Sequence, residues 1–460
     1  MAAGGARLTP VTRPPLTSSQ RLLATGLVLG VTLVAFEVTA VVTAMPTIAD
    51  DLDGDSLFGL AAAVYTLANL VATVAAGELA DRRGAVVPYA WSIATFVVGL
   101  VVAAVAPSMV WIVIGRTLQG AGTGAFAPIG YVLVKRAFPD EWHATMFAVL
   151  SAGWVLPSLF APAISGVVVD ILGWRWAFLM IVPAALAVGA LAIGPMRAYP
   201  PTLTERRRSQ VPVAALAALG VGAWATGVQM EDPVAATVVA VAGAVVAWRG
   251  LRRLLPAGWT RAAAGLPALI LCRFLATAAF MGVDSFVPLA ASRVHGASPT
   301  VQGFVIIGAA LFWTVGQWIR ARWPRPDHRR AIREGFVILA FGIVLATPVL
   351  WDGWPLALVF AGWSVGGLGM GLLFNPSTMA STAYATDGSE GRISSQVSLA
   401  DSLGFSVMGG LGGGAVALAE HTSATLRGSL LVTFAIAACL AVAGGAAASR
   451  SGRSVGDHAA

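Results

Sequence analysis

Charged side chains are scarce in this chain. Of its 460 residues only 11% are Asp, Glu, Lys or Arg, whereas 57% are hydrophobic, and the mean hydropathy is +0.79. Soluble globular domains carry about 25% charged residues, so the composition excludes an ordinary soluble enzyme or binding domain. It predicts a protein that crosses a membrane many times.

Cysteine and histidine are also rare, which argues against several kinds of site. The two cysteines, Cys272 and Cys439, lie in or at the edge of apolar segments and predict neither a disulfide framework nor a metal centre. The five histidines lie in loops, at span ends or in the C-terminal tail: His143, His295, His328, His421 and His458. Because no histidine cluster has zinc-ligand spacing, we expect no enzyme activity and no bound metal.

The net charge of +7 does not indicate a nucleic-acid partner, because the basic residues lie between the apolar runs. Most runs are long enough to cross a bilayer as helices, and no alternating ten-residue pattern indicates a barrel. We expect an all-α polytopic membrane protein. An N-terminal bundle (22–196) comprises spans at about 22–45, 57–80, 85–106, 109–134, 144–169 and 174–196. A C-terminal bundle (266–448) comprises spans at about 268–291, 299–319, 333–350, 354–378, 394–418 and 426–447.

Between the two bundles, the linker 197–265 contains two shorter apolar runs, 213–230 and 234–248. The stretches that flank this pair are basic, while the turn Glu231-Asp232-Pro233 within it is acidic. Cytoplasmic loops are enriched in Lys and Arg, so the pattern predicts a full crossing and return. We expect fourteen spans with cytoplasmic tails at 1–21 and 449–460; a shallow re-entrant hairpin is the alternative.

Ionisable residues within the spans are few, and each is a functional hypothesis because burying a charge in a bilayer costs several kcal/mol, about 2.5 to 3.5 on insertion scales. Four such residues are Glu37, Arg116, Asp284 and Asp401. Glu37 and Arg116 fall at comparable depth, which makes an ion pair feasible; a static pair that only fixes packing is the alternative. We expect Arg273 to lie close enough to a span end to reach the membrane surface.

Polar stripes and aromatic residues within spans indicate where a substrate could bind. Asp284 shares a helix face with Thr277, and Asp401 shares one with Ser394 and Ser398, so both acids are expected to face a common cavity. Core packing is the alternative for each aromatic residue. The candidate substrate contacts are Tyr65, Asn69, Gln119, Trp154, Phe280, Asp284, Trp313, Trp363 and Asp401.

Glycine ladders repeat between the two halves, at Gly120, Gly122 and Gly124 and again at Gly367, Gly369 and Gly371. Small residues at this spacing let membrane helices approach closely. The ladders therefore predict helix packing, not chemistry, and they indicate two homologous bundles.

Four motifs together resemble the major facilitator superfamily. The octet 77–84, GELADRRG, is similar to the family's loop between the second and third helices. RTLQG at 116–120 is similar to its fourth-span motif, and FEVTAVVTAMP at 36–46 resembles the first-span motif of fourteen-span drug:proton antiporters, with Glu37 in place of Asp. APAISG at 161–166 resembles the antiporter motif G-P-x-x-G-G but lacks two of its glycines.

The resemblance implies a proton-coupled exporter of lipophilic or cationic small molecules that works by rocking of the two bundles. It would act as a monomer in the cell (inner or plasma) membrane, with the proton gradient and no other cofactor. Proton coupling would fall to Glu37 and Arg116, and a conformational gating loop to Gly77, Asp81, Arg82, Arg83 and Gly84. Asp284 is a further candidate for proton coupling because it is an acid within a span, with no family motif behind it; a structural hydrogen-bond acceptor is the alternative. A proton-coupled importer of a nutrient and a non-transporting membrane sensor or scaffold remain as alternatives.

Overall fold

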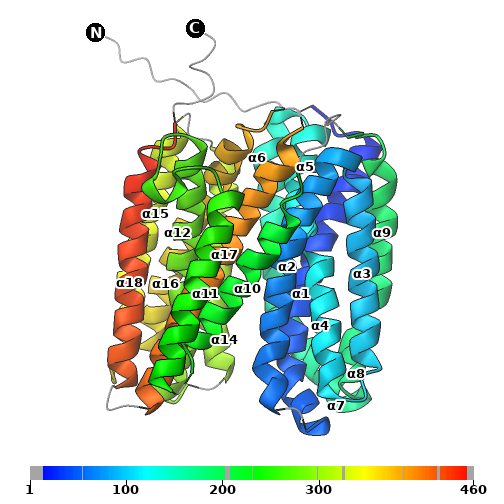
Figure 1. The fold of residues 1–460 in the computed structure, drawn as a ribbon. Helices are drawn as coiled ribbons and strands as arrows, with labels where there is room; N and C mark the ends of the chain where they lie inside the picture. The colour runs from blue at the N-terminus through cyan, green and yellow to red at the C-terminus, as the bar shows by residue number, and fades with distance from the viewer. Residues whose placement is uncertain are drawn as a thin grey trace, which may run out of the picture.

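All regular elements in the described part of the chain are helices, as the composition predicts, and most run roughly parallel to one another (Figure 1). The structure is a computed structural model. It describes residues 14–53, 55–201, 208–230, 232–297, 299–323, 327–386, 388–421 and 425–452. Nine helices among these residues are long and apolar enough to cross a membrane.

The first half contains nine helices that form six rods, where a rod is one predicted span built from one helix or from two consecutive helices. They are α1 (Ser18–Asp51), α2 (Asp55–Arg83), α3 (Val86–Ala104), α4 (Met109–Thr123), α5 (Phe126–Ala137), α6 (Asp140–Ala152), α7 (Val155–Leu172), α8 (Arg175–Leu179) and α9 (Ile181–Met196). The inserted pair comprises α10 (Val211–Gly227) and α11 (Pro233–Leu254), followed by the short 3-10 helix η1 (Trp259–Arg261).

The second half repeats the arrangement of six rods. They are formed by α12 (Leu266–Asp284), α13 (Val287–His295), α14 (Pro299–Arg322), α15 (His328–Ala346) with η2 (Thr347–Leu350), α16 (Leu356–Thr382), α17 (Glu390–His421) and α18 (Leu426–Ala448).

Four predicted spans are interrupted, and proline explains each interruption. A proline ring clashes with the carbonyl of the residue four positions earlier and offers no N–H to it. Pro128, Pro157, Pro183 and Pro288 each follow a helix break by three to five residues, at the junctions α4/α5, α6/α7, α8/α9 and α12/α13. The spans predicted as continuous at 109–134, 144–169, 174–196 and 268–291 are therefore pairs of shorter helices.

The glycine ladders bring helices into close contact in the same way in both halves. A Cβ at Gly120 would overlap the backbone of Tyr65 on α2, and one at Gly367 would overlap the backbone of Ala309 on α14. Gly122 likewise meets α3 at Phe96, as Gly369 meets α15. The packing interpretation of the ladders is confirmed: α4 and α16 occupy equivalent places between two neighbours.

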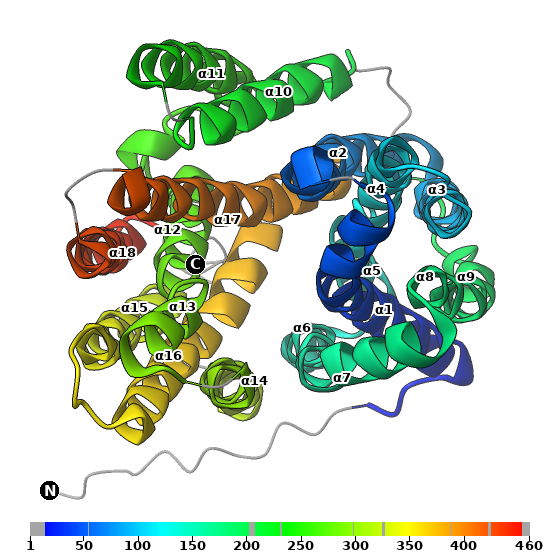
Figure 2. The ribbon, with the colours of Figure 1, turned by 90° about the horizontal axis from the view of Figure 1, so that it is seen from below.

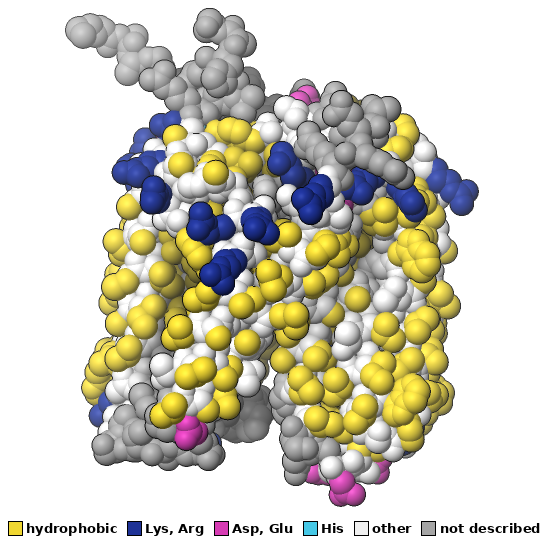
Figure 3. All heavy atoms as spheres, viewed as in Figure 1, with side chains coloured by type: hydrophobic (Ala, Val, Ile, Leu, Met, Phe, Trp, Pro, Cys, Tyr) yellow, Lys and Arg dark blue, Asp and Glu magenta, His cyan; other side chains and the backbone are white. Residues whose placement is uncertain are grey.

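Buried apolar side chains form three clusters. One lies among α1–α9, the second mainly among α12–α18, and the third joins α10 and α11 to α2, α12 and α17. Figure 2 shows two groups of helices with α10 and α11 outside them, beside α2 and α17. The two halves meet at the upper end of Figure 1, where α2 ends and α17 begins, and Figure 3 shows a hollow between them at the lower end.

Candidate functional site

A buried ion pair lies in the core of the first half. Glu37 of α1 is fully buried and pairs with the guanidinium of Arg116 on α4. The same guanidinium lies 4.2 Å from the centroid of the Tyr65 ring on α2 and donates a 2.8 Å hydrogen bond to Gln119 Oε1. The proximity of Glu37 and Arg116 expected from their depth is therefore present in the structure.

Other predicted residues extend this polar layer. Gln119 Nε2 donates to the carbonyl of Gly99 on α3 at 3.2 Å, and Asn69 Nδ2 donates to Thr123 Oγ1 at 3.0 Å. Glu37 Oε2 is buried and has no hydrogen-bond partner among the described residues.

Four predicted residues of the second half also meet. Asp284 on α12 accepts a 2.8 Å hydrogen bond from Trp363 Nε1 on α16. Trp363 stacks on Phe280 with ring centroids 4.9 Å apart, and Phe280 meets the edge of Trp313 on α14 at 5.1 Å. Trp363 is fully buried. The group therefore combines one acid with a continuous aromatic surface, and in this arrangement it is packed within the bundle.

Arg273 is a correction to the sequence interpretation, which placed it near the membrane surface. It is fully buried on α12 and pairs with Asp401 of α17; its Nε lies 3.0 Å from Asp401 Oδ1. It also donates to Thr378 Oγ1 at 2.9 Å and lies 3.5 Å from the Phe374 ring centroid. Its helix begins at Leu266, about 10 Å before it at 1.5 Å per residue, so the side chain meets α16 and α17 inside the bundle.

The two acids of the second half have different partners, Trp363 for Asp284 and Arg273 for Asp401. The expected common cavity for them remains a prediction. Trp154 joins neither group. It lies at the junction of α6 and α7 with 48% of its surface exposed.

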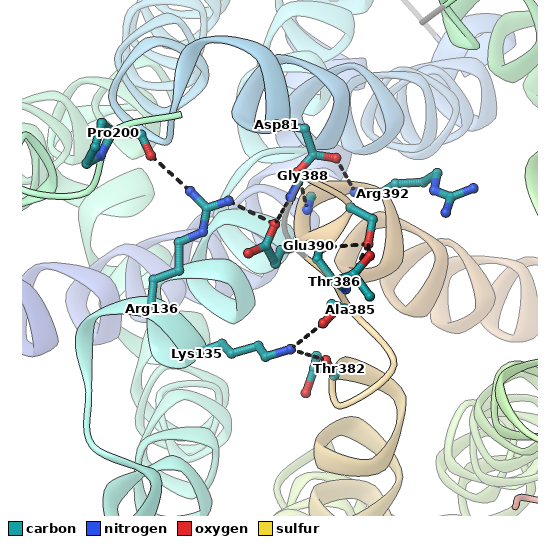
Figure 4. A network of polar contacts seen from close by, with 12 residues as sticks. Asp81, Lys135, Arg136, Pro200, Thr382, Ala385, Thr386, Gly388, Glu390 and Arg392 are labelled. Carbon is teal, nitrogen blue, oxygen red and sulfur yellow. Dashed lines mark hydrogen bonds and ion pairs between the residues drawn. The ribbon is translucent and has the colours of Figure 1, made fainter. Parts of the chain in front are cut away.

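The predicted gating loop contacts the other half through two of its residues. The Asp81 carboxylate accepts hydrogen bonds from the backbone N–H of Gly391 at 2.6 Å and of Arg392 at 3.0 Å (Figure 4). These groups belong to the first turn of α17, whose N–H groups lack helical partners and favour a negative charge. A Cβ on Gly77 would overlap the Gly391 carbonyl, so this approach requires glycine.

The remaining residues of the loop are Arg82, Arg83 and Gly84. Arg82 lies 3.9 Å from Glu78, one helical turn earlier, and Arg83 is exposed. Gly84 follows the end of α2 with φ +78°, a left-handed conformation that glycine adopts without a Cβ penalty. It allows the chain to turn directly into α3.

Sequence reasoning missed three further residues that join the halves. Lys135 Nζ donates to the carbonyls of Thr382 at 2.8 Å and Ala385 at 2.9 Å, and Arg136 pairs with Glu390 at 2.9 Å (Figure 4). The only local signal is the Lys135-Arg136 pair at a span end, which by itself indicates topology. Its partners lie about 250 residues away and carry no local signal.

Comparison with known proteins places this geometry among transporters. The model of the Major Facilitator Superfamily matches residues 27–409. A probable multidrug-efflux transporter of Mycobacterium tuberculosis is 30% identical over 379 residues, which cover 75% of this chain and 78% of that protein. The methylenomycin A resistance protein of Streptomyces coelicolor is 26% identical over 372 residues, 77% of this chain and 77% of that protein.

Solved structures share the fold at low sequence identity. The human organic anion transporter superposes with a TM-score of 0.71 at 13% identity, covering 95% of this chain and 100% of that one. A proton:xylose symporter superposes with a TM-score of 0.68 at 12% identity, covering 93% and 95%. At such identities the likeness concerns the fold alone.

Proposed function

We propose that this chain, which belongs to the major facilitator superfamily, exports lipophilic or cationic small molecules in exchange for protons. It is a multi-pass membrane transporter. Two curated relatives are named for multidrug efflux and for methylenomycin A resistance, and this supports the export of small organic molecules. The observation that carries proton coupling is the buried pair of Glu37 and Arg116.

We assign the upper end of Figure 1 to the cytoplasm of the cell, because basic side chains gather there and positive loops stay inside. On this assignment both termini are cytoplasmic. The halves are then closed toward the cytoplasm by Asp81, Lys135 and Arg136 and hollow toward the outside. The arrangement fits the state in which an exporter releases substrate and takes up a proton.

In this scheme Glu37 takes the proton from the outside. Protonation removes the charge that attracts Arg116, so the pair separates, and the two halves gain freedom to rock toward the state that opens inward. When the pair forms again, the guanidinium favours the ionised carboxylate, and the proton leaves on the cytoplasmic side. Because Glu37 on α1 and Arg116 on α4 belong to the same half, this coupling requires α1 to shift relative to α4 when the two halves rock.

The aromatic group of the second half is the proposed substrate surface. Phe280 and Trp363 stack on each other and Trp313 meets Phe280 edge-on, and all three are packed within the bundle in this conformation. A planar or lipophilic substrate would therefore reach these rings in another conformation, in which Asp284 supplies a negative charge for a cation.

Glu37→Gln tests the proposal in proteoliposomes with ethidium as the probe cation. Glutamine keeps the size and a hydrogen bond but cannot release a proton, so we expect accumulation driven by a proton gradient to fall at least a hundredfold. Ethidium binding should stay within about threefold. Asp352→Asn is the matched control, because Asp352 is an exposed acid paired with Arg427 far from the buried pair. Wild-type accumulation by Glu37→Gln would contradict the assignment and make Asp284 the next candidate.

A further inference from the structure

The exposed face of α11 carries a cluster of unpaired arginines. Arg249, Arg252 and Arg253 share one face of its last two turns, and Arg261 follows on η1. All four side chains are exposed, and none of their guanidinium groups has a hydrogen bond or ion pair in the described part of the chain. We call these four residues the basic patch.

The chain segment that carries the basic patch contains no acidic residue that could pair with it. Between residues 233 and 283 the chain contains no Asp or Glu. The buried arginines Arg116 and Arg273, by contrast, each have a carboxylate partner. Four guanidinium groups left together on one surface therefore form a local excess of positive charge that attracts anions.

An apolar stripe continues from the basic patch along the same helix face. Val234, Val238, Val241 and Val245 recur at helical spacing and are 73%, 62%, 58% and 42% exposed. Trp248, which is 44% exposed, lies where the stripe meets the arginines. In Figure 3, basic side chains gather over the upper part of α11 and hydrophobic side chains continue below them.

We propose that the basic patch binds the phosphate of an anionic phospholipid, whose acyl chains lie along the valine stripe. Arginine presents a planar fork of donors that matches phosphate oxygens, and it keeps its charge at every physiological pH. From Arg249 to Val241 the helix rises about 12 Å, comparable to one leaflet's hydrocarbon depth of roughly 15 Å. The basic patch thus matches the head group of a phospholipid, and the valine stripe matches its acyl chains. A free anion or a nucleic acid would leave the valine stripe without a partner.

The site would act on the inserted pair. The opposite face of α10 and α11 packs on α2, α12 and α17, through the cluster that includes Leu70, Ala217, Leu251 and Leu403. These neighbours belong to both halves of the transporter. A lipid held on α11 would therefore stabilise the pair against the side of the molecule where the halves meet.

Binding is tested with the purified full-length protein in an uncharged detergent. Phosphatidylglycerol and phosphatidylcholine with the same acyl chains are titrated, and bound lipid is counted by native mass spectrometry. We expect phosphatidylglycerol to bind at least tenfold more tightly. Each arginine near an anionic group contributes about fivefold, so Arg249→Ala/Arg252→Ala should weaken binding roughly 25-fold. Arg197→Ala, an exposed arginine after α9, is the matched control and should change binding less than twofold.

Three results would overturn the proposal. The first is equal binding of the two lipids, and the second is an equal loss of lipid binding in the control and in the double variant. The third is displacement of the lipid by glycerol 3-phosphate at comparable concentration, because this would indicate a site for free anions. If the double variant does not insert, phosphatidylglycerol with a photoreactive acyl chain is applied to the wild type. Cross-links concentrated in 233–254 support the proposal, and cross-links spread evenly over the lipid-facing helices refute it.

Discussion

Each half of the molecule holds one buried arginine between a carboxylate and an aromatic ring. Arg116 lies between Glu37 and Tyr65, and Arg273 lies between Asp401 and Phe374. The ring face attracts the guanidinium, and the carboxylate offsets its positive charge. Both contacts lower the free-energy cost of burying the arginine. The first pair could be predicted from depth alone. The second could not, because the depth of Arg273 depends on where its helix begins and on a partner 128 residues away.

Arg273→Met should destabilise the protein strongly, because it leaves the Asp401 carboxylate without its charge partner in the bundle. Breaking a fully buried pair costs about 3 to 5 kcal/mol; we expect a loss toward the lower end here, because the Asp401 side chain is 21% exposed. Arg273→Met/Asp401→Leu removes both charges and should recover most of this loss. Thermal unfolding in detergent measures both variants, with Arg197→Ala as an exposed control. If Arg273→Met unfolds at the wild-type temperature, the pair contributes little to stability.

Helix boundaries show how far local sequence determines the elements. The six rods of each half follow from apolar run length, and the four breaks follow from the prolines within those runs. What local sequence does not determine is the neighbour of each rod. The close approach of α4 to α2 at Gly120 is set by packing between segments that are 55 residues apart at that contact, Tyr65 and Gly120.

Of the two inserted helices, α11 is long enough to cross the membrane, whereas α10 is a few ångströms shorter than the apolar core. At 1.5 Å per residue, the 17 residues of α10 extend about 26 Å and the 22 of α11 about 33 Å, against a hydrocarbon thickness of about 30 Å. Asp232 caps the start of α11 by accepting from Ala235 N at 2.6 Å. A full crossing would place this cap on the outside of the cell.

Asp232→Cys should therefore react with a membrane-impermeant thiol reagent added to intact cells. The exposed Cys439 is replaced by Ala to remove background labelling, while Cys272 is buried. Arg197→Cys, at the opposite end of the molecule, is the matched control and should react only after the membrane is opened. Labelling of Asp232→Cys from the cytoplasmic side alone would contradict the fourteen-span topology and favour the re-entrant alternative.

At the scale of the whole molecule, the two halves are held together by a few polar contacts at one end. Asp81, Lys135 and Arg136 lie on the first half, and each meets the end of α16 or the start of α17. The sequence indicates that such loops exist, through the octet and the basic pairs. It cannot indicate their partners, because a contact between residues about 250 to 310 positions apart depends on which way the two halves have rocked.

Asp81→Asn should weaken the closure at this end. The carboxylate accepts two hydrogen bonds from backbone N–H groups at the start of α17, and a neutral amide oxygen loses the charge assistance and the attraction of the helix dipole. A hydrogen bond to a charged group is worth about 1.5 to 3 kcal/mol. We therefore expect the ratio of closed to open molecules to fall at least tenfold.

The population is measured from the distance between spin labels at Arg197→Cys and Arg322→Cys, after replacement of Cys439, because these positions follow or end helices of different halves at the same end. A longer distance should become populated in Asp81→Asn. Asp232→Asn is the control: it removes an acid that caps α11 at the other end and should leave the distance distribution unchanged. Identical distributions in wild type and Asp81→Asn would mean that Lys135 and the pair of Arg136 with Glu390 hold the halves together without it.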